Sequence, residues 1–360
     1  MRIPLSRQAA GWAGSVLLAL AASSVGYSQE LLAWGRRGQD CPPVPCPTPT
    51  TEKPATPPTP APVTEPSPLL PDTLASAVGG EGVAVAASNV GYIDPALPQN
   101  VFRFRFDAAY DNNRPDRAEF FYAKCGCFRT AVPPDPKAAG PPLPETRVDY
   151  QDFTAYGELA YNHRVSAFLE IPVRLLNPEQ NNNTSGLADI NAGFKVAMIS
   201  CPDTVFSFQF RTYIPTGDSD RGLGTNHVSL EPGLLLFQRL SDRLVLEAEF
   251  KDWNAVGGSD FAGDLIRYGV GLSYDVYRCG GRRIAPVVEF VGWTILDGKE
   301  SDALTGETIK DSAGETIVNA KLGARFFLGD SNSLYVGYGR ALTGDVWYKD
   351  IFRVEYRLAF

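Results

Sequence analysis

Apolar and polar residues alternate with a period of two through most of the chain from Asn100 to the carboxy terminus. Because the side chains of an extended strand point alternately to opposite faces, each such run predicts a β-strand with one apolar face. The last strand shows the pattern most fully, with the sequence FRVEYRLAF over residues 352–360. Its apolar face carries Phe352, Val354, Tyr356, Leu358 and Phe360, and its polar face carries Arg353, Glu355 and Arg357.

About twelve such segments of about 9 to 13 residues follow one another, which is the length of a tilted strand that crosses a membrane. Long polar connections start near Asp111, Leu175, Thr216, Asn254, Asp297 and Thr343. They alternate with short turns near Asn162, Cys201, Ser241, Cys279 and Asp330. This rhythm is typical of the outer loops and periplasmic turns of a membrane barrel. It predicts an all-β fold over residues 100–360, a transmembrane antiparallel up-and-down β-barrel of about 12 strands.

The cost of placing charge in lipid decides which face of each strand points outward. A Lys or Arg at mid-bilayer on the outer surface of a barrel costs about 2–4 kcal/mol. Several outward arginines would therefore cancel a whole domain's stability of about 5–15 kcal/mol. The apolar faces are expected to meet lipid, and the charged residues to line the lumen. The lumen-lining candidates are Arg103, Arg105, Asp107, Glu170, Lys195, Arg211, Glu247, Glu249, Arg267, Arg325, Arg353, Glu355 and Arg357.

The amino-terminal residues carry an export pattern. Arg2 and Arg7 precede an apolar run at residues 9–22, and small residues follow up to Ser28. This pattern predicts a secretory signal peptide over residues 1–28, cleaved after Ser28. No later apolar stretch reaches the roughly 18 residues of a spanning helix. Export together with a barrel pattern predicts the outer membrane of a Gram-negative-type envelope as the location.

Residues 29–99 form a lead that separates the signal peptide from the barrel. Proline is dense between Cys41 and Pro66, which favours a disordered, semi-rigid periplasmic linker rather than packed structure. Cys41 and Cys46 could pair with each other or with another chain in an oxidising compartment. Two alternatives stay open for the small, weakly patterned residues from Leu69 to Gln99. They form either a disordered lead-in or a segment inserted into the mouth of the barrel.

Composition argues against several classes of chemistry. The chain has only two His and two Met, and its formal net charge of −8 speaks against a nucleic-acid surface. It contains no phosphate loop, zinc spacing or dinucleotide fingerprint, so neither a cofactor nor a metal is expected. Asp218, Asp220 and Asn226 share one loop, but their spacing matches no calcium loop. Glu247 and Glu249 share one strand face, either as an acid–base pair or as lumen charges balanced by arginines.

His227 and Ser229 are the strongest enzymatic hint, because they lie two apart on one strand face. This spacing resembles that of outer-membrane phospholipase A, a twelve-stranded barrel with a His-Ser-Asn site. In that family the pair faces the lipid. Here Val228 and Leu230 claim the lipid face, and no orienting Asn can be assigned. The chain is therefore predicted not to be an enzyme, with a lipid hydrolase using His227 and Ser229 as the alternative.

The remaining cysteines lie in connections between strands. Cys125-Gly-Cys127 lies in the first long loop and is expected to form a staple to another cysteine rather than a redox motif. Cys201 and Cys279 lie in different short turns, so their pairing with each other is not predicted.

Two further stretches resemble known barrels. The last strand, 352–360, resembles the closing strand of bacterial outer-membrane β-barrels, where a terminal Phe with alternating apolar residues is the signal to the barrel assembly machinery. Residues 186–236 contain GLADINAGFKVAM, FQFRTYIPTGDSDRGLGTN and HVSLEPGLLL. This stretch is similar to the barrel family named for the MetA pathway of phenol degradation, although Ala188 stands where a Gly is usual. The resemblance implies an outer-membrane barrel that passes small solutes, with hydrophobic or aromatic molecules as candidates.

The sequence as a whole favours an outer-membrane channel or transporter for small solutes. One alternative is a structural barrel whose Pro-rich lead ties the outer membrane to the cell wall, and another is the lipid hydrolase. The expected partners are outer-membrane lipid, the barrel assembly machinery, a small-molecule solute and, through the lead, the cell wall.

Overall fold

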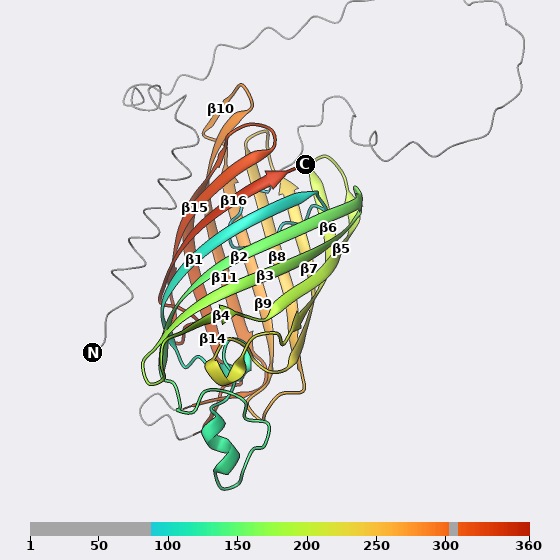
Figure 1. Ribbon diagram of the computed structural model, residues 1–360. Coiled ribbons are helices and arrows are strands. Elements are labelled where there is room, and N and C mark those ends of the chain that lie inside the picture. Colours follow the sequence, from blue (N-terminus) through green and yellow to red (C-terminus); the bar gives the residue numbers. More distant parts are fainter. Residues whose placement is uncertain (1–87, 302–308) are drawn as a thin grey trace, which may run out of the picture.

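A computed structural model describes residues 88–301 and 309–360 of the chain. Its main sheet has 14 strands, of which β4 and β10 are short additions, so that twelve strands of the described chain form a closed antiparallel barrel (Figure 1). The barrel strands are β1 (Val101–Asn113), β2 (Arg147–Asn162), β3 (Val165–Pro178), β5 (Ile190–Ser200), β6 (Thr204–Ile214), β7 (Val228–Arg239), β8 (Leu244–Val256), β9 (Asp264–Tyr274), β11 (Arg282–Ile295), β14 (Thr316–Phe327), β15 (Asn332–Ala341) and β16 (Asp350–Ala359). The predicted all-β barrel is confirmed.

Several short elements lie at the two ends of the barrel. They are the strands β4 (Thr184–Leu187), β10 (Tyr277–Cys279), β12 (Lys299–Ser301) and β13 (Ile309–Asp311), and the 3-10 turns η2 (Arg117–Glu119), η3 (Gly126–Thr130) and η4 (Ser219–Arg221). None of the helices in the described ranges has the length and apolar character needed to cross a membrane.

The barrel closes by pairing its first strand with its last. β1 runs antiparallel to β16, with Arg103 opposite Arg357 and Asp107 opposite Arg353. All neighbouring barrel strands are antiparallel, which places successive connections at alternate ends. The long connections gather at one end, and the short turns lie at the other end together with the carboxy terminus and β10 (Figure 1).

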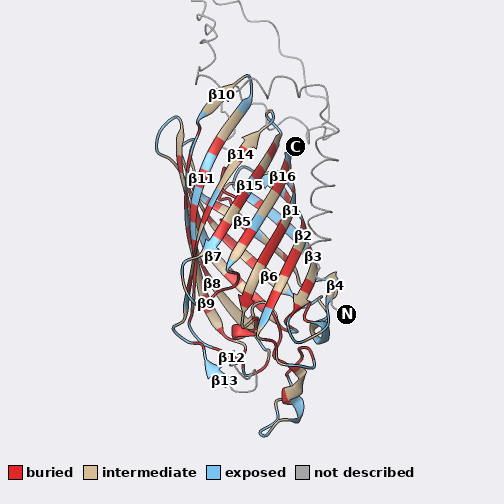
Figure 2. Ribbon diagram, turned by 90° about the vertical axis from the view of Figure 1, so that its left-hand side faces the viewer, coloured by how far each residue is buried: buried red, intermediate tan, exposed pale blue. Residues whose placement is uncertain are grey.

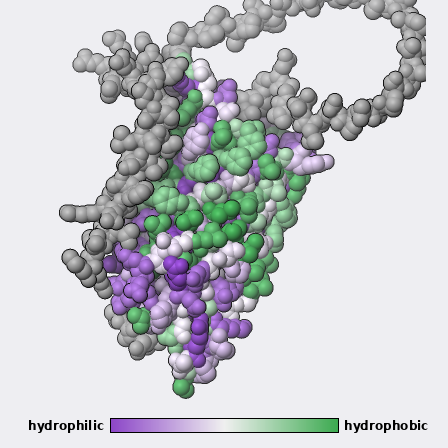
Figure 3. Space-filling model, viewed as in Figure 1, coloured by the Kyte–Doolittle hydropathy of each residue, from purple (hydrophilic) through white to green (hydrophobic). Residues whose placement is uncertain are grey.

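Burial alternates along the strands as the sequence pattern predicts (Figure 2). Large apolar side chains point outward, among them Phe104 at 58% exposure and Phe250 at 52%. Charged side chains such as Lys195 and Arg325 are buried inside. Apolar residues cover the middle of the outer surface, whereas polar residues gather toward the end with the long loops (Figure 3). Closure also pairs the backbone groups of the strands, which a hydrocarbon environment requires.

Residues 88–99 lie inside the barrel before β1 begins, which is the second of the two alternatives for the end of the lead. They hydrogen-bond to strands on several sides of the lumen, including β8, β11, β14 and β16. The signal peptide, the Pro-rich stretch, Cys41 and Cys46 lie outside the described residues.

Candidate functional site

The inner wall of the barrel holds every lumen-lining candidate, buried or half-buried. Most of them pair with a neighbour of opposite charge. Arg353 forms two hydrogen bonds to Asp107, of 2.6 and 2.7 Å. Arg105 contacts Asp107 at 3.2 Å and Glu170 at 2.8 Å. The charges of the first and last strands therefore largely neutralise one another, as buried charges must.

The same pairing continues around the wall. Arg325 and Arg357 share the carboxylate of Glu355, at 2.9 and 2.6 Å. Lys195 of β5 binds Glu158 of β2 at 2.9 Å. These strands lie on the side of β1 that is away from β16. Neither Glu158 nor the acidic residue of β11, Glu289, was among the sequence-predicted lumen residues. Glu289 stands between Val288 and Phe290, so the alternation itself was a signal that could have found it.

Two cations on the wall have an aromatic partner and, in the described chain, no carboxylate within 4 Å. The guanidinium of Arg103 lies 3.4 Å from the ring centre of Tyr156, and its Nε is buried without a hydrogen-bond partner. The Nζ of Lys321 donates to the Tyr348 hydroxyl at 2.7 Å and lies 3.9 Å from the ring centre of Tyr92. Aromatic faces carry negative potential, so these contacts partly offset the cost of burial.

We call residues 88–99 the lumen segment, and three glutamates of the wall bind its backbone N–H groups. Glu247 accepts from residues 89 and 90, at 2.9 and 3.3 Å. Glu289 accepts from residues 91, 92 and 93, at 3.1, 2.9 and 3.1 Å. Glu249 accepts from residue 94 at 3.0 Å. The Glu247–Glu249 pair therefore holds main chain rather than standing free for acid–base work.

Arginines of the wall bind the backbone carbonyl groups of the same segment. Arg357 donates to the carbonyl oxygens of residues 88 and 90, at 3.1 and 2.8 Å. Arg325 donates to those of residues 89 and 90, at 3.0 and 2.8 Å. Arg353 and Arg267 donate to those of residues 91 and 92, at 2.6 and 3.2 Å. The lumen arginines predicted from the sequence thus converge on a short stretch of main chain.

Two residues of the lumen segment also fix its register. The carboxylate of Asp94 contacts Arg211 at 2.7 Å and Lys251 at 2.5 Å. Gly91 lies next to the ring of Tyr335, and a Cβ at this position would be 2.2 Å from the ring. Only a residue without a side chain fits there unless the ring moves.

A cavity of about 270 Å³ lies beside the lumen segment, bounded by Gly91–Asp94 and by wall residues that include Arg103, Arg105 and Arg211. Its lining also contains the aromatic residues Phe120, Phe121, Tyr150, Tyr213, Trp253, Trp293, Trp347 and Tyr348. Several of these rings pack together, as Tyr213 does on Trp253 with 4.4 Å between ring centres. The cavity therefore offers both cationic groups and aromatic faces.

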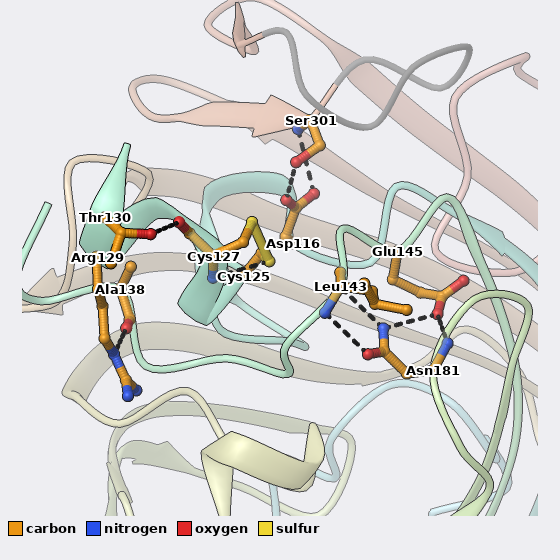
Figure 4. Close-up of a disulfide and its surroundings, with 10 residues drawn as sticks. All are labelled: Asp116, Cys125, Cys127, Arg129, Thr130, Ala138, Leu143, Glu145, Asn181 and Ser301. Atoms are coloured by element: carbon orange, nitrogen blue, oxygen red, sulfur yellow. Dashed lines mark hydrogen bonds between the residues drawn. A yellow bond between two sulfur atoms is a disulfide. The ribbon is translucent and has the colours of Figure 1, made fainter. Parts of the chain in front are cut away.

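The first long loop, residues 114–146, contributes to the outer end of the lumen. Asp116 accepts hydrogen bonds from the backbone N–H and the hydroxyl of Ser301, at 3.3 and 2.5 Å (Figure 4). Burial raises the pKa of Asp116 to about 6, an effect that the Ser301 hydrogen bonds oppose. Arg117, fully buried, binds Glu300 at 2.6 Å and Glu315 at 3.0 Å. These contacts tie the first loop to the β12–β13 hairpin.

Cys125 and Cys127 form a disulfide with each other within this loop (Figure 4). The expectation of a staple to another cysteine is wrong, because the turn at η3 brings the two Cα atoms within 5.2 Å. Cys201 is free and exposed. Cys279 takes part in a disulfide.

The two residues of the enzymatic alternative lie on the inner side of β7 or at its end. His227 is buried, with its Nδ1 3.1 Å from the Thr225 carbonyl oxygen and 3.6 Å from the Glu119 carboxylate. Ser229 is buried in the lining of the cavity. Neither side chain faces the lipid side of the wall.

Asp218, Asp220 and Asn226 belong to no metal-ligand cluster of the described residues. Asp220 lies 2.8 Å from Arg129, and no group of three or more His, Cys, Asp or Glu side chains in the described ranges is arranged to hold a metal ion.

Comparisons with known proteins show the family of the chain. Residues 146–349 match the model of the family described as "Putative MetA-pathway of phenol degradation". The search of curated proteins found no match. Among solved structures, an outer membrane channel from Pseudomonas putida F1 has 12% identity and a TM-score of 0.48, covering 74% of this chain and 100% of its own. The KdgM porin has 7% identity and a TM-score of 0.40, covering 72% and 99%.

A third structure, the NanC porin, has 6% identity and a TM-score of 0.40, covering 71% of this chain and 100% of its own. The family match spans more than half of the chain, and it includes the stretch in which the sequence resembles that family. The closed barrel with its apolar outer surface is an outer-membrane β-barrel, and the chain belongs to the MetA-pathway of phenol degradation family.

Proposed function

We propose that the protein is an outer-membrane channel or transporter for small solutes, and that the lumen segment closes it in the state described here. The observation that carries this proposal is the cavity of about 270 Å³ inside a closed barrel, with the lumen segment along one side of it. A membrane barrel that served only as a scaffold would not need an inner wall of charges organised around a segment of its own chain beside a cavity. Its lipid-facing surface and its last strand are the expected contacts with membrane lipid and with the barrel assembly machinery.

The lining of the cavity supports small hydrophobic or aromatic solutes, including those that carry a negative charge. Trp253 offers an indole N–H that is buried without a hydrogen-bond partner. Arg103 and Lys321 are the wall cations without a carboxylate partner among the described residues. An aromatic solute with one anionic group could therefore stack on a ring and bind a cation in the same cavity.

The test is solute entry into lipid vesicles that contain the purified full-length protein. In the variant Gly91→Val, the new side chain would collide with Tyr335 and should displace the lumen segment. The matched control is Gly344→Val, at a loop position where a Cβ meets nothing within 4 Å. We expect Gly91→Val to admit benzoate at least tenfold faster than the native protein, and Gly344→Val to behave as native. Equal rates in all three, with displacement of the segment verified by amide exchange, would contradict the proposal.

A further inference from the structure

We propose that the lumen wall is a binding site for the main chain of a peptide that bends as residues 91–93 do, and that it accepts a separate peptide whenever its own lumen segment is displaced. The proposal concerns what the wall recognises. It goes beyond solute passage and can be tested without it.

The acceptor side of this site is the inner face of three adjacent strands. Glu247 and Glu249 project from β8, Glu289 projects from β11, and β9 pairs with both strands. Together the three carboxylates accept the N–H groups of residues 89–94 without a gap. The segment bends at residues 91–93, and this bend turns three consecutive N–H groups toward the one carboxylate of Glu289.

The middle strand of this face lets a backbone approach closely. On β9 the inward positions between the two acidic strands are Gly269 and Gly271. A Cβ on Gly271 would be 2.6 Å from Val90, and a Cβ on Gly269 would be 3.1 Å from Ile93. Side chains at these two positions would therefore push the lumen segment away from the glutamates.

The donor side lies on β14 and β16, with one arginine from β9. Arg325, Arg353, Arg357 and Arg267 bind the carbonyl oxygens of residues 88–92. Peptide groups supply both partners that this wall needs, a donor for the glutamates and an acceptor for the arginines. Because these contacts go to main chain, they are independent of most side chains of the bound segment.

The wall distinguishes between side chains at only a few positions of the bound segment. Gly91 is required by the ring of Tyr335. Asp94 is favoured by Arg211 and Lys251, and Asn89 exchanges hydrogen bonds with Ser273 and Arg283. The ligand class is therefore a peptide that bends at a glycine and carries an acidic residue three positions later. A neutral sugar chain of the same length offers no such alternation of N–H and carbonyl groups.

The experiment measures binding of a fluorescein-labelled peptide, residues 88–100 (SNVGYIDPALPQN), to full-length protein in detergent by fluorescence anisotropy. The Gly91→Val protein, whose own segment is displaced, should bind the peptide, and the native protein at least tenfold more weakly because its site is filled. Asp94→Ala serves as a second protein with a weakened segment if Gly91→Val does not assemble.

Backbone recognition is tested by changing the peptide and the wall separately. A peptide methylated on the nitrogens of positions 90 and 92 keeps every side chain but loses two donors, and it should bind at least tenfold more weakly. Adding Glu289→Gln to the Gly91→Val protein should weaken binding, whereas Glu179→Gln, in an exposed loop, should not. Equal binding of the methylated and unmethylated peptides would overturn the proposal, as would no binding to a protein whose segment is shown by amide exchange to be displaced. The solute-entry assay and the peptide-binding assay can give opposite results. Each proposal can therefore be contradicted without contradicting the other.

Discussion

Glu289 shows how a single buried charge can be satisfied by main chain. One carboxylate oxygen accepts from residues 92 and 93, and the other accepts from residue 91 and from the Tyr335 hydroxyl at 3.1 Å. A carboxylate has about four lone-pair sites, so its capacity is used in full. Without these donors, the buried anion would need a cation or would have to take up a proton.

Phe250 tests the assignment of faces, because it lies near the middle of β8 and points outward at 52% exposure. Phe250→Arg should lower the free energy of unfolding in lipid vesicles by about 2–4 kcal/mol, since it puts a charge into hydrocarbon. The control Phe250→Leu stays apolar and should cost less than about 1.5 kcal/mol. Urea titrations that give equal losses for the two variants would show that this face does not meet lipid.

Individual strands were the most predictable part of the molecule. Alternation is a local pattern, so the strands and their two faces can be derived from neighbouring residues alone. The lumen segment could not be predicted in this way. Its sequence, SNVGYID over residues 88–94, has no sustained period, and its partner Glu247 lies 158 residues away from Asn89. Its place is set by contacts that exist only after the barrel has closed.

The last strand carries the prediction for assembly. The Phe360 ring stacks on Phe102 of the first strand with 5.0 Å between ring centres, and its N–H donates to the carbonyl oxygen of residue 100 at 3.2 Å. Deletion of Phe360 should lower the amount of assembled protein in the membrane while export continues, whereas Phe360→Tyr should assemble nearly as well as native. Heat-modifiable gel mobility measures the assembled fraction. Unchanged assembly after the deletion would mean that the terminal ring is not part of the signal.

The whole molecule combines an apolar outer surface with a polar lumen that is occupied by its own chain. The sequence predicted that the charges point inward, but not that the arginines and glutamates of the wall would converge on one segment. That convergence depends on which strands face one another across the lumen, and strand closure determines it rather than local pattern. The lining of the cavity also contains aromatic rings of two long loops, namely Phe120, Phe121, Trp347 and Tyr348.

Amide hydrogen exchange of the native full-length protein in detergent tests most directly that the lumen segment is bound by the wall. The N–H groups of residues 89–94 all donate to buried carboxylates. They should exchange slower by a factor of about 100 or more than those of the exposed turn at Gly280 and Gly281. Glu289→Gln should speed exchange at residues 91–93 more than at residue 94. Exchange at residues 89–94 as fast as in the turn would contradict a closed lumen.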